Sequence, residues 1–175
     1  MSLQRQFTTL ANYNRAQNEA LYQCCAQLSD EQRREELGLF FGSIHATLNH
    51  ILLGDTLWLR RFCAQYPDPQ LQQQLDRIGQ IERLDQILFE DYDLLHKTRI
   101  RLDHAIQTYM LHLNEDDFAA NCAYSNTKGE SLSKPFSLLL LHFFNHQTHH
   151  RGQLSTALQQ LGHNWGDTDL VLWID

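Results

Sequence analysis

The chain has 175 residues, of which 42% are hydrophobic and 20% charged, a composition typical of a folded domain and not of a disordered chain. We therefore expect one domain spanning residues 1–175. The formal net charge is −7 and the 14 basic residues are scattered, which argues against a surface that binds nucleic acid. No stretch approaches the ~20 apolar residues of a membrane span, which argues against a membrane partner as well.

The cysteines at positions 24, 25, 63 and 122 show no Cys-x-x-Cys spacing. Adjacent cysteines such as Cys24 and Cys25 are a poor start for a disulfide framework, so we expect reduced, buried thiols in a cytoplasmic protein. The first residues also show no apolar signal core, which agrees with that location.

The first predicted helix runs from the start of the chain to about Gln27, because apolar residues recur there at intervals of three and four. Asn14 and Asn18 interrupt this apolar stripe one turn apart and should face the interior. They either hydrogen-bond to neighbouring helices, the interpretation we favour, or line a polar pocket. A short helix should start at Ser29, which is followed by acidic residues suited to a first turn.

A second long helix is predicted over residues 39–66, where Pro67 and Pro69 end it. His50 lies on the apolar side of this helix, whereas His45 shares a face with Asn49 and Thr56. If one histidine of the helix reaches the interior, His50 is the better candidate.

The remaining chain predicts a polar connection over residues 70–86 with one short helical piece and a third helix over residues 89–113. Residues 124–129 have the composition of a turn and could close a small hairpin. Pro135 suits the first turn of a fourth helix, which Gly162 ends after about Leu161. The tail should be a loop followed by an apolar segment lying on the body. The sequence thus predicts an all-α fold, a four-helix bundle with long connections.

The fourth helix carries histidines at positions 142, 146, 149 and 150. Helical spacing puts His146 and His150 on the apolar face one turn apart, and His142 and His149 on a neighbouring polar face. A His-x-x-x-His pair can share a metal ion, or it can be an ordinary buried pair with hydrogen-bond partners. The spacing alone favours neither interpretation.

A third ligand is available if the second and fourth helices face each other, because His50 would then meet His146 and His150. Imidazole suits zinc or nickel best in this setting, with iron and copper as further options. Three protein ligands leave a position open for water or substrate. Side chains that could orient the rings are those of Asn14, Asn18, Asn49, Asp55 and Asn145.

Several segments resemble the DinB (damage-inducible) family. They are residues 11–15, residues 40–52, Asp55 with Trp58-Leu59, the string Phe144-Asn145-His146-Gln147-Thr148-His149-His150-Arg151-Gly152-Gln153, and residues 166–170. The resemblance runs nearly end to end. It implies a four-helix bundle with metal ligands at His50, His146 and His150, usually a homodimer, in the bacterial cytoplasm. Ala16 departs from the pattern, where an aromatic residue is expected, which bears on the packing of the first helix.

The wider superfamily to which this family is similar includes metal-dependent transferases and isomerases that use low-molecular-weight thiols. The resemblance therefore implies an enzyme that binds a small thiol at the metal and transfers it to an electrophile. The alternatives are a non-catalytic metal-binding stress-response protein and a metal-dependent hydrolase. Candidates for a general base are Tyr13, Tyr124, His142 and His149. We expect Arg151 to pair with a carboxylate of a neighbouring helix, with contact to an anionic substrate as the alternative.

Overall fold

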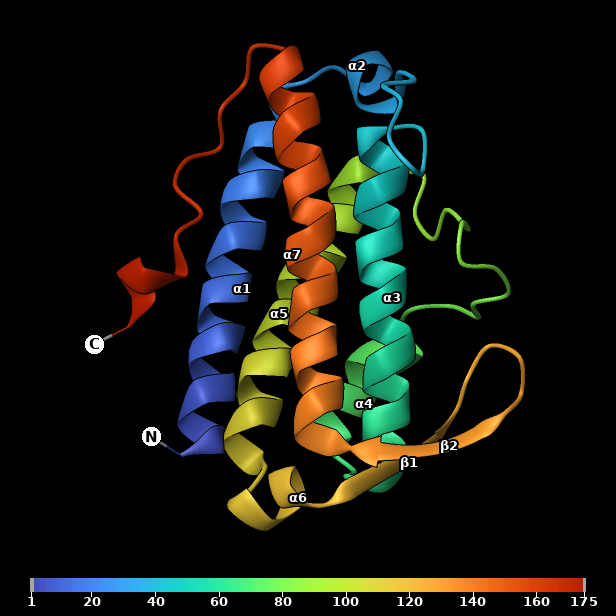
Figure 1. Cartoon of the computed structure of the whole chain (residues 1–175). Coiled ribbons are helices and arrows are strands. Elements are labelled where there is room, and N and C mark those ends of the chain that lie inside the picture. Colours follow the sequence, from blue (N-terminus) through green and yellow to red (C-terminus); the bar gives the residue numbers. More distant parts are fainter. Residues whose placement is uncertain (1, 175) are drawn as a thin grey trace.

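The computed structural model describes residues 2–174, and in this range four long helices form a bundle (Figure 1). The long helices are α1 (Leu3–Cys25), α3 (Ile44–Gln65), α5 (Tyr92–His112) and α7 (Phe136–Gln160). The shorter elements are α2 (Asp30–Arg34), α4 (Pro69–Asp76), α6 (Glu115–Ala119), β1 (Asn121–Ser125), β2 (Ser131–Pro135) and the 3-10 turn η1 (Leu170–Trp173). The predicted all-α four-helix bundle is confirmed.

Side-chain caps set the starts of most helices. Ser29 Oγ accepts a hydrogen bond from the backbone N–H of Gln32, and the backbone N–H of Ser29 donates to Gln32 Oε1. These two bonds form a capping box, which confirms the predicted start of α2. Asp91 caps α5, which therefore begins at Tyr92 and not at residue 89. Gly162, with φ of 81°, ends α7 as predicted.

The predicted start of the second long helix at Leu39 is wrong, because α3 begins five residues later, after its cap Ser43. Residues 37–43 form a tight loop instead. The Leu37 N–H donates to the Gly42 carbonyl at 2.9 Å, and Gly42 has a φ of 80°, a left-handed conformation that favours glycine. Apolar spacing alone did not reveal this loop.

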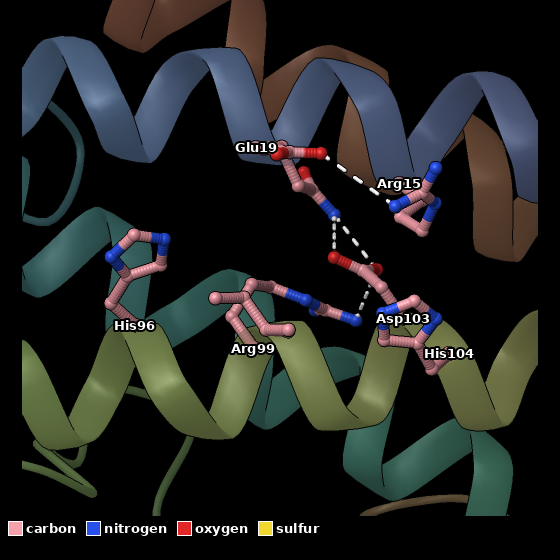
Figure 2. Close-up of a pocket in the computed structure, with 8 residues that line it drawn as sticks. Arg15, Glu19, His96, Arg99, Asp103 and His104 are labelled. Carbon is pink, nitrogen blue, oxygen red and sulfur yellow. Dashed lines mark hydrogen bonds and ion pairs between the residues drawn. The ribbon is translucent and has the colours of Figure 1, made fainter.

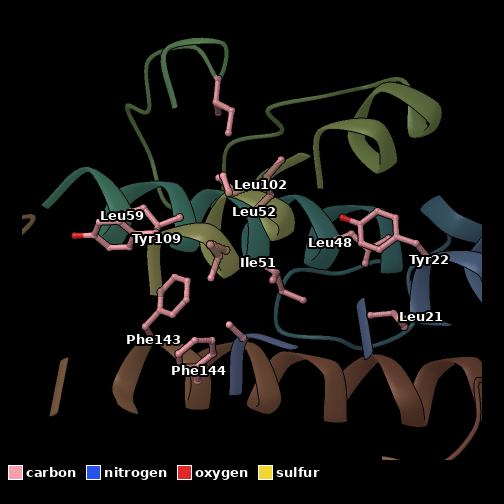
Figure 3. Packing of buried hydrophobic residues seen from close by; sticks show 14 of the residues in the cluster. Leu21, Tyr22, Leu48, Ile51, Leu52, Leu59, Leu102, Tyr109, Phe143 and Phe144 are labelled. Carbon is pink, nitrogen blue, oxygen red and sulfur yellow. The ribbon is translucent and has the colours of Figure 1, made fainter. Parts of the chain in front are cut away.

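The hydrophobic core lies between the four helices. Figure 3 shows Phe143 and Phe144 pointing from α7 toward the apolar side chains of α3 and α5. Phe62 of α3 packs edge-on against Phe143 with ring centroids 6.1 Å apart. Each such buried side chain contributes about 1.5–3 kcal/mol relative to leaving it in water.

The hairpin predicted between the third and fourth long helices is confirmed. β1 and β2 pair antiparallel, and Gly129 closes the turn with a φ of 80°. Figure 1 shows this hairpin at one end of the bundle and α2 at the other. The short helical piece expected in the 70–86 connection is α4, which begins at Pro69.

The C-terminal segment returns along α1 (Figure 1). The Tyr13 hydroxyl donates to the Thr168 carbonyl at 2.6 Å, and the Gln17 amide donates to the Asp167 carbonyl at 3.1 Å. The tail therefore lies on the body as predicted, although Val171 and Leu172 face solvent.

The cysteines are free and buried, as expected of reduced thiols. Within residues 2–174, helices with both the length and the apolar character needed to cross a bilayer are absent.

Candidate metal centre

Three histidines from two helices converge on one point. His50 lies on α3, and His146 and His150 lie one turn apart on α7. His146 Nε2 is 3.3 Å from His50 Nε2 and 3.2 Å from His150 Nε2, and one ring nitrogen of each residue lies within 4.8 Å of the other two. The predicted facing of the second and fourth long helices therefore brings together the three residues chosen as ligands.

The outer nitrogens of two of these rings have acceptors as partners. His50 Nδ1 lies 2.9 Å from the Leu84 carbonyl oxygen, and His150 Nδ1 lies 2.8 Å from Gln153 Oε1. Because a carbonyl oxygen only accepts, each Nδ1 must carry the proton and donate it. In a neutral ring the Nε2 atom is then a bare acceptor. The lone pairs of His50 and His150 consequently both point toward His146.

Two converging lone pairs fit a cation better than a single shared proton. Two nitrogens bound to zinc at about 2.0–2.1 Å in tetrahedral geometry lie about 3.3–3.4 Å apart. The two Nε2 separations of 3.3 and 3.2 Å match this spacing closely. The three residues therefore fit a divalent transition metal ion, and the group could hold one.

The rings are also held in the neutral state that a metal requires. Burial, together with the charge that His150 would carry, lowers the pKa of His146 to about 3. Burial likewise lowers the pKa of His150 to about 4, against the raising effect of its bond to Gln153, and burial lowers the pKa of His50. Protons therefore compete weakly for the nitrogens of His146 and His150 above about pH 5.

The lowered pKa values of these histidines have a measurable consequence at pH 6. His146 and His150 are already neutral there, so together they are expected to release far less than one proton when Zn²⁺ binds. Two unperturbed histidines with a pKa of about 6.5 would release roughly 1.5 protons at the same pH. Titration calorimetry in two buffers of different ionisation enthalpy counts the protons. The count also includes His50, whose pKa is lowered by burial, so release of two protons or more would contradict the lowered pKa values. The part of the affinity that depends on His146 and His150 should stay flat down to about pH 5 and fall as the pH approaches 4.

Gly54 makes room for the central ring. A Cβ at this position of α3 would lie 2.7 Å from His146 Cε1, closer than real contacts allow. His146 therefore occupies the space that any other residue at position 54 would fill. A lone glycine in a helical pattern gives no indication of what approaches it, so this requirement could not be predicted from the sequence.

Substituting Gly54 is expected to damage the site while leaving the helix intact. In Gly54→Ala the imidazole must shift, and we expect zinc affinity to fall by about tenfold or more, the effect of losing ring orientation. Gly152→Ala on α7 is the matched control, because its Cβ would meet open space. Both substitutions raise helix propensity by up to ~1 kcal/mol. Competition with a chelator, alongside thermal unfolding, separates the two effects, and equal zinc affinity in both variants would contradict the role of Gly54.

The side chains predicted to orient the rings lie elsewhere. Asn14 and Asn18 hydrogen-bond to Asp103 on α5, and Asp55 pairs with Arg99 at 2.5 Å, all away from the imidazoles. Asn145 is exposed on α7. The partners of the rings are instead a backbone carbonyl and Gln153, so the expectation for these four residues is corrected.

Asn49 acts on the site indirectly. Its Oδ1 accepts the N–H groups of Leu88 and Phe89 at 2.9 Å each, and its Nδ2 donates to the Phe89 carbonyl at 3.2 Å. His45 Nε2 contacts the same carbonyl at 3.0 Å. The helix face predicted to be polar is thus buried beneath residues 84–91, the connection whose Leu84 carbonyl holds His50.

A second polar cluster fills the middle of the bundle, and each of the four long helices contributes to it. Its residues are Asn14, Asn18, Asp55, Arg99, Asp103, Gln147 and Arg151, all buried. Figure 2 shows Arg99 and Asp103 projecting from α5 toward α1, and their side chains pair at 2.8 Å. The favoured interpretation of the α1 asparagines, hydrogen bonding to neighbouring helices, is confirmed.

Arg151 belongs to this cluster and not to the metal centre. It donates to Asn14 and Asn18 on α1, and burial lowers its pKa to about 10. It also donates to the Thr148 hydroxyl at 3.1 Å, so its hydrogen-bond partners are two amides and a hydroxyl, which corrects the expected carboxylate. Arg151 and Gln147 follow His150 and His146 directly in the sequence, so the cluster fixes a face of α7 about 100° round the helix from the one that presents the ligands.

The four candidate general bases lie in different surroundings. The Tyr13 hydroxyl binds the C-terminal segment, and Tyr124 of the hairpin packs on Trp58. His142 also packs on Trp58, with ring centroids 5.1 Å apart. His149 is exposed, and its ring lies 4.8 Å from that of His150. His149 is therefore the candidate beside an accessible part of the centre.

A pocket of about 510 Å³ opens directly onto the centre. Two of the three histidines of the centre, His50 and His150, line it. The other lining residues are Phe40, Phe41, Leu84, Asp85, His149 and Gln153. Phe41 stacks on the His50 ring with centroids 3.8 Å apart and planes 22° apart. The volume lies within the range of small-molecule sites, about 300–1,000 Å³. The centre therefore has both three convergent ligands and an approach for a small molecule.

Comparison with known proteins agrees with these features. The chain is 26% identical over 173 residues to Protein DinB of Bacillus subtilis (strain 168), covering 94% of this chain and 91% of the relative. Its fold is similar to the crystal structure of a DinB-like protein from Bacillus cereus ATCC 10987, with a TM-score of 0.55, 17% identity, and coverage of 86% of this chain and 89% of the other. The model of the DinB family matches residues 1–175. The chain therefore belongs to the DinB family.

Proposed function

We propose that this protein binds a divalent transition metal ion, zinc or nickel before iron or copper, and transfers a low-molecular-weight thiol to an electrophile. The observation that carries the proposal is the meeting of three imidazoles beside a pocket of about 510 Å³. When bound, a divalent ion would supply Lewis acidity, which lowers the pKa of a thiol. Three protein ligands leave a place for that thiol.

Different residues of the chain would have different roles in such a site. His50 and His150 hold their nitrogens toward the centre through bonds to Leu84 and Gln153. Phe41 covers one side of the His50 ring and excludes water from it. His149 lies at the pocket wall and is positioned to accept the proton that the thiol loses. These roles fit a metal site that is open to a substrate better than a site whose ion only stabilises the fold.

The test is a screen of zinc-loaded and nickel-loaded protein with several cellular thiols and 1-chloro-2,4-dinitrobenzene. In this reaction a C–S bond forms, the C–Cl bond breaks, chloride leaves, and the thiol proton passes to His149 or water. We expect turnover with at least one thiol, and loss of turnover in His146→Ala. Stoichiometric metal without turnover for every thiol would favour a non-catalytic metal-binding protein instead.

We also propose that the protein is a homodimer in the bacterial cytoplasm. Exposed apolar side chains on α7 and the tail, among them Leu138, Leu141 and Leu172, support a protein contact on this side. The free cysteines support a reducing compartment. Sedimentation equilibrium tests the assembly, since a mass of one chain at micromolar concentration would contradict it.

A further inference from the structure

Phe40 is an exposed aromatic residue beside the metal centre, with 81% of its surface accessible to solvent. It is the neighbour of Phe41, whose ring meets it edge-on with centroids 4.9 Å apart. Both residues line the pocket that opens onto the histidines. The proposed chemistry at the metal accounts for Phe41, which covers His50, but gives Phe40 no role.

The loop that carries Phe40 is closed by its own backbone. The Leu37 N–H donates to the Gly42 carbonyl at 2.9 Å, and the Gly42 N–H donates to the Leu39 carbonyl at 2.8 Å. Gly38 and Gly42 both have positive φ, at 69° and 80°. Phe41 anchors the loop further, since its ring lies 3.8 Å from that of His50 and 5.7 Å from that of His150. Phe40 is therefore held outward by an ordered turn.

The rest of the pocket is apolar near Phe40 and polar at its edge. Leu84, half exposed, contributes a second apolar wall. Asp85 is the acidic residue among the described residues that line the pocket. Its carboxylate already pairs with the Arg83 guanidinium, with a nitrogen–oxygen distance of 2.6 Å. The walls therefore offer contact area to a flat apolar group.

We infer that this pocket binds a planar aromatic group of the substrate, placed against Phe40 and Leu84 next to the point where His50 and His150 converge. The inference deepens the proposed function, because it assigns the aromatic group to the electrophile that receives the thiol. Binding of the group itself needs neither metal nor thiol. The inference can therefore be tested separately from the reaction.

The experiment titrates metal-free protein with 2-naphthol and with decahydro-2-naphthol, which have the same carbon skeleton but differ in planarity. Calorimetry should show saturable binding of one 2-naphthol per chain, at least fivefold tighter than binding of the saturated alcohol. Phe40→Ala should weaken 2-naphthol binding at least fivefold, and Phe40→Trp should retain it. Because Phe40 is exposed, its removal should leave the thermal midpoint unchanged. Leu172→Ala, an exposed apolar residue on the tail, is the matched control and should bind as the parent does.

Equal affinity for the two alcohols would overturn the inference, and so would binding that is insensitive to Phe40→Ala or equally weakened by Leu172→Ala. The failure of the proposed function looks different. Selective naphthol binding without thiol transfer would support this pocket and contradict the proposed reaction. Thiol transfer without selective naphthol binding would support the reaction and overturn the aromatic pocket.

Discussion

The purified protein is expected to hold about one divalent metal ion per chain, and replacing His50 or His146 with alanine is expected to remove it. Each substitution leaves two imidazoles, and loss of a ligand costs more than the roughly 10–100-fold in affinity that loss of an orienting partner costs. In His146→Ala the nitrogen that lies within 3.3 Å of both others disappears. Metal analysis after gel filtration, together with zinc titration against a chelator, measures the loss.

His149→Ala is the control for this experiment. His149 adjoins His150, and its substitution removes an imidazole, the same group that is removed in the ligand variants. The His149 side chain, however, is exposed and lies outside the cluster of convergent nitrogens. We expect this variant to keep its ion. A metal-free parent protein, or retention of metal in both ligand variants, would contradict the site.

Removing Arg99 is expected to produce the largest loss of stability in the chain. Its guanidinium, 1% exposed, pairs with Asp55 at 2.5 Å and with Asp103 at 2.8 Å. Arg99→Met leaves both carboxyl groups buried without their cation, which costs about 3–5 kcal/mol. Since domains are stable by about 5–15 kcal/mol, this is a large share of the free energy of unfolding. Urea denaturation of the metal-free protein measures it.

Arg34→Met provides the comparison, because Arg34 also pairs with two carboxylates, those of Asp30 and Glu90, but at the surface. Such pairs contribute about 0–1 kcal/mol. A triple variant in which Asn also replaces Asp55 and Asp103 should recover part of the stability lost in Arg99→Met, because the two unpaired carboxylates are gone and Arg151 is the buried charge of the cluster that remains. Equal losses in the Arg34 and Arg99 single variants would contradict the importance of the buried pairs.

The pH dependence of the Arg99→Met variant has a defined sign. Burial raises the pKa of Asp55 to about 7 and raises that of Asp103, although Arg99 opposes both shifts. Without Arg99 the folded-state pKa values rise further, while the unfolded values stay near 4. The folded variant then binds more protons than the unfolded chain above pH 4. The contribution of these two carboxyl groups should therefore be greatest at or below pH 4 and fall as the pH rises toward 8. It is measured as the difference between the variant and the parent protein at each pH, because the buried histidines, which lower stability at low pH, are common to both.

The arrangement of the three ligands could be predicted from sequence because it depends on helical periodicity. His146 and His150 recur at one-turn spacing within an apolar stripe, and His50 lies on the apolar side of its own helix. Two such faces meet in any antiparallel bundle. The same reasoning found the inward direction of Asn14 and Asn18, although not the partners that they contact.

The parts that could not be predicted depend on backbone positions and on loops. The Leu84 carbonyl that orients His50 is a group that every residue possesses, so the sequence gives no sign of it. The face with His45 and Asn49 looked polar because the connection over residues 84–91 that covers it has no helical period. The loop with Phe40 continued an apolar pattern and was therefore predicted as helix. Tertiary packing decided these cases, not local propensity.

The spacing of His50 and His146 along the chain has a consequence for folding. The two residues are 96 positions apart, so an ion shared between them would close a ring that runs through α5 and the hairpin. Such a ring restricts the unfolded chain in the way that a reversible cross-link does, and each doubling of its length adds about 0.6 kcal/mol. At a free metal concentration of about 100 times Kd the folded state gains about 2.7 kcal/mol. The supply of the ion in the cell would then regulate how long the folded protein persists, independently of any reaction that it carries out.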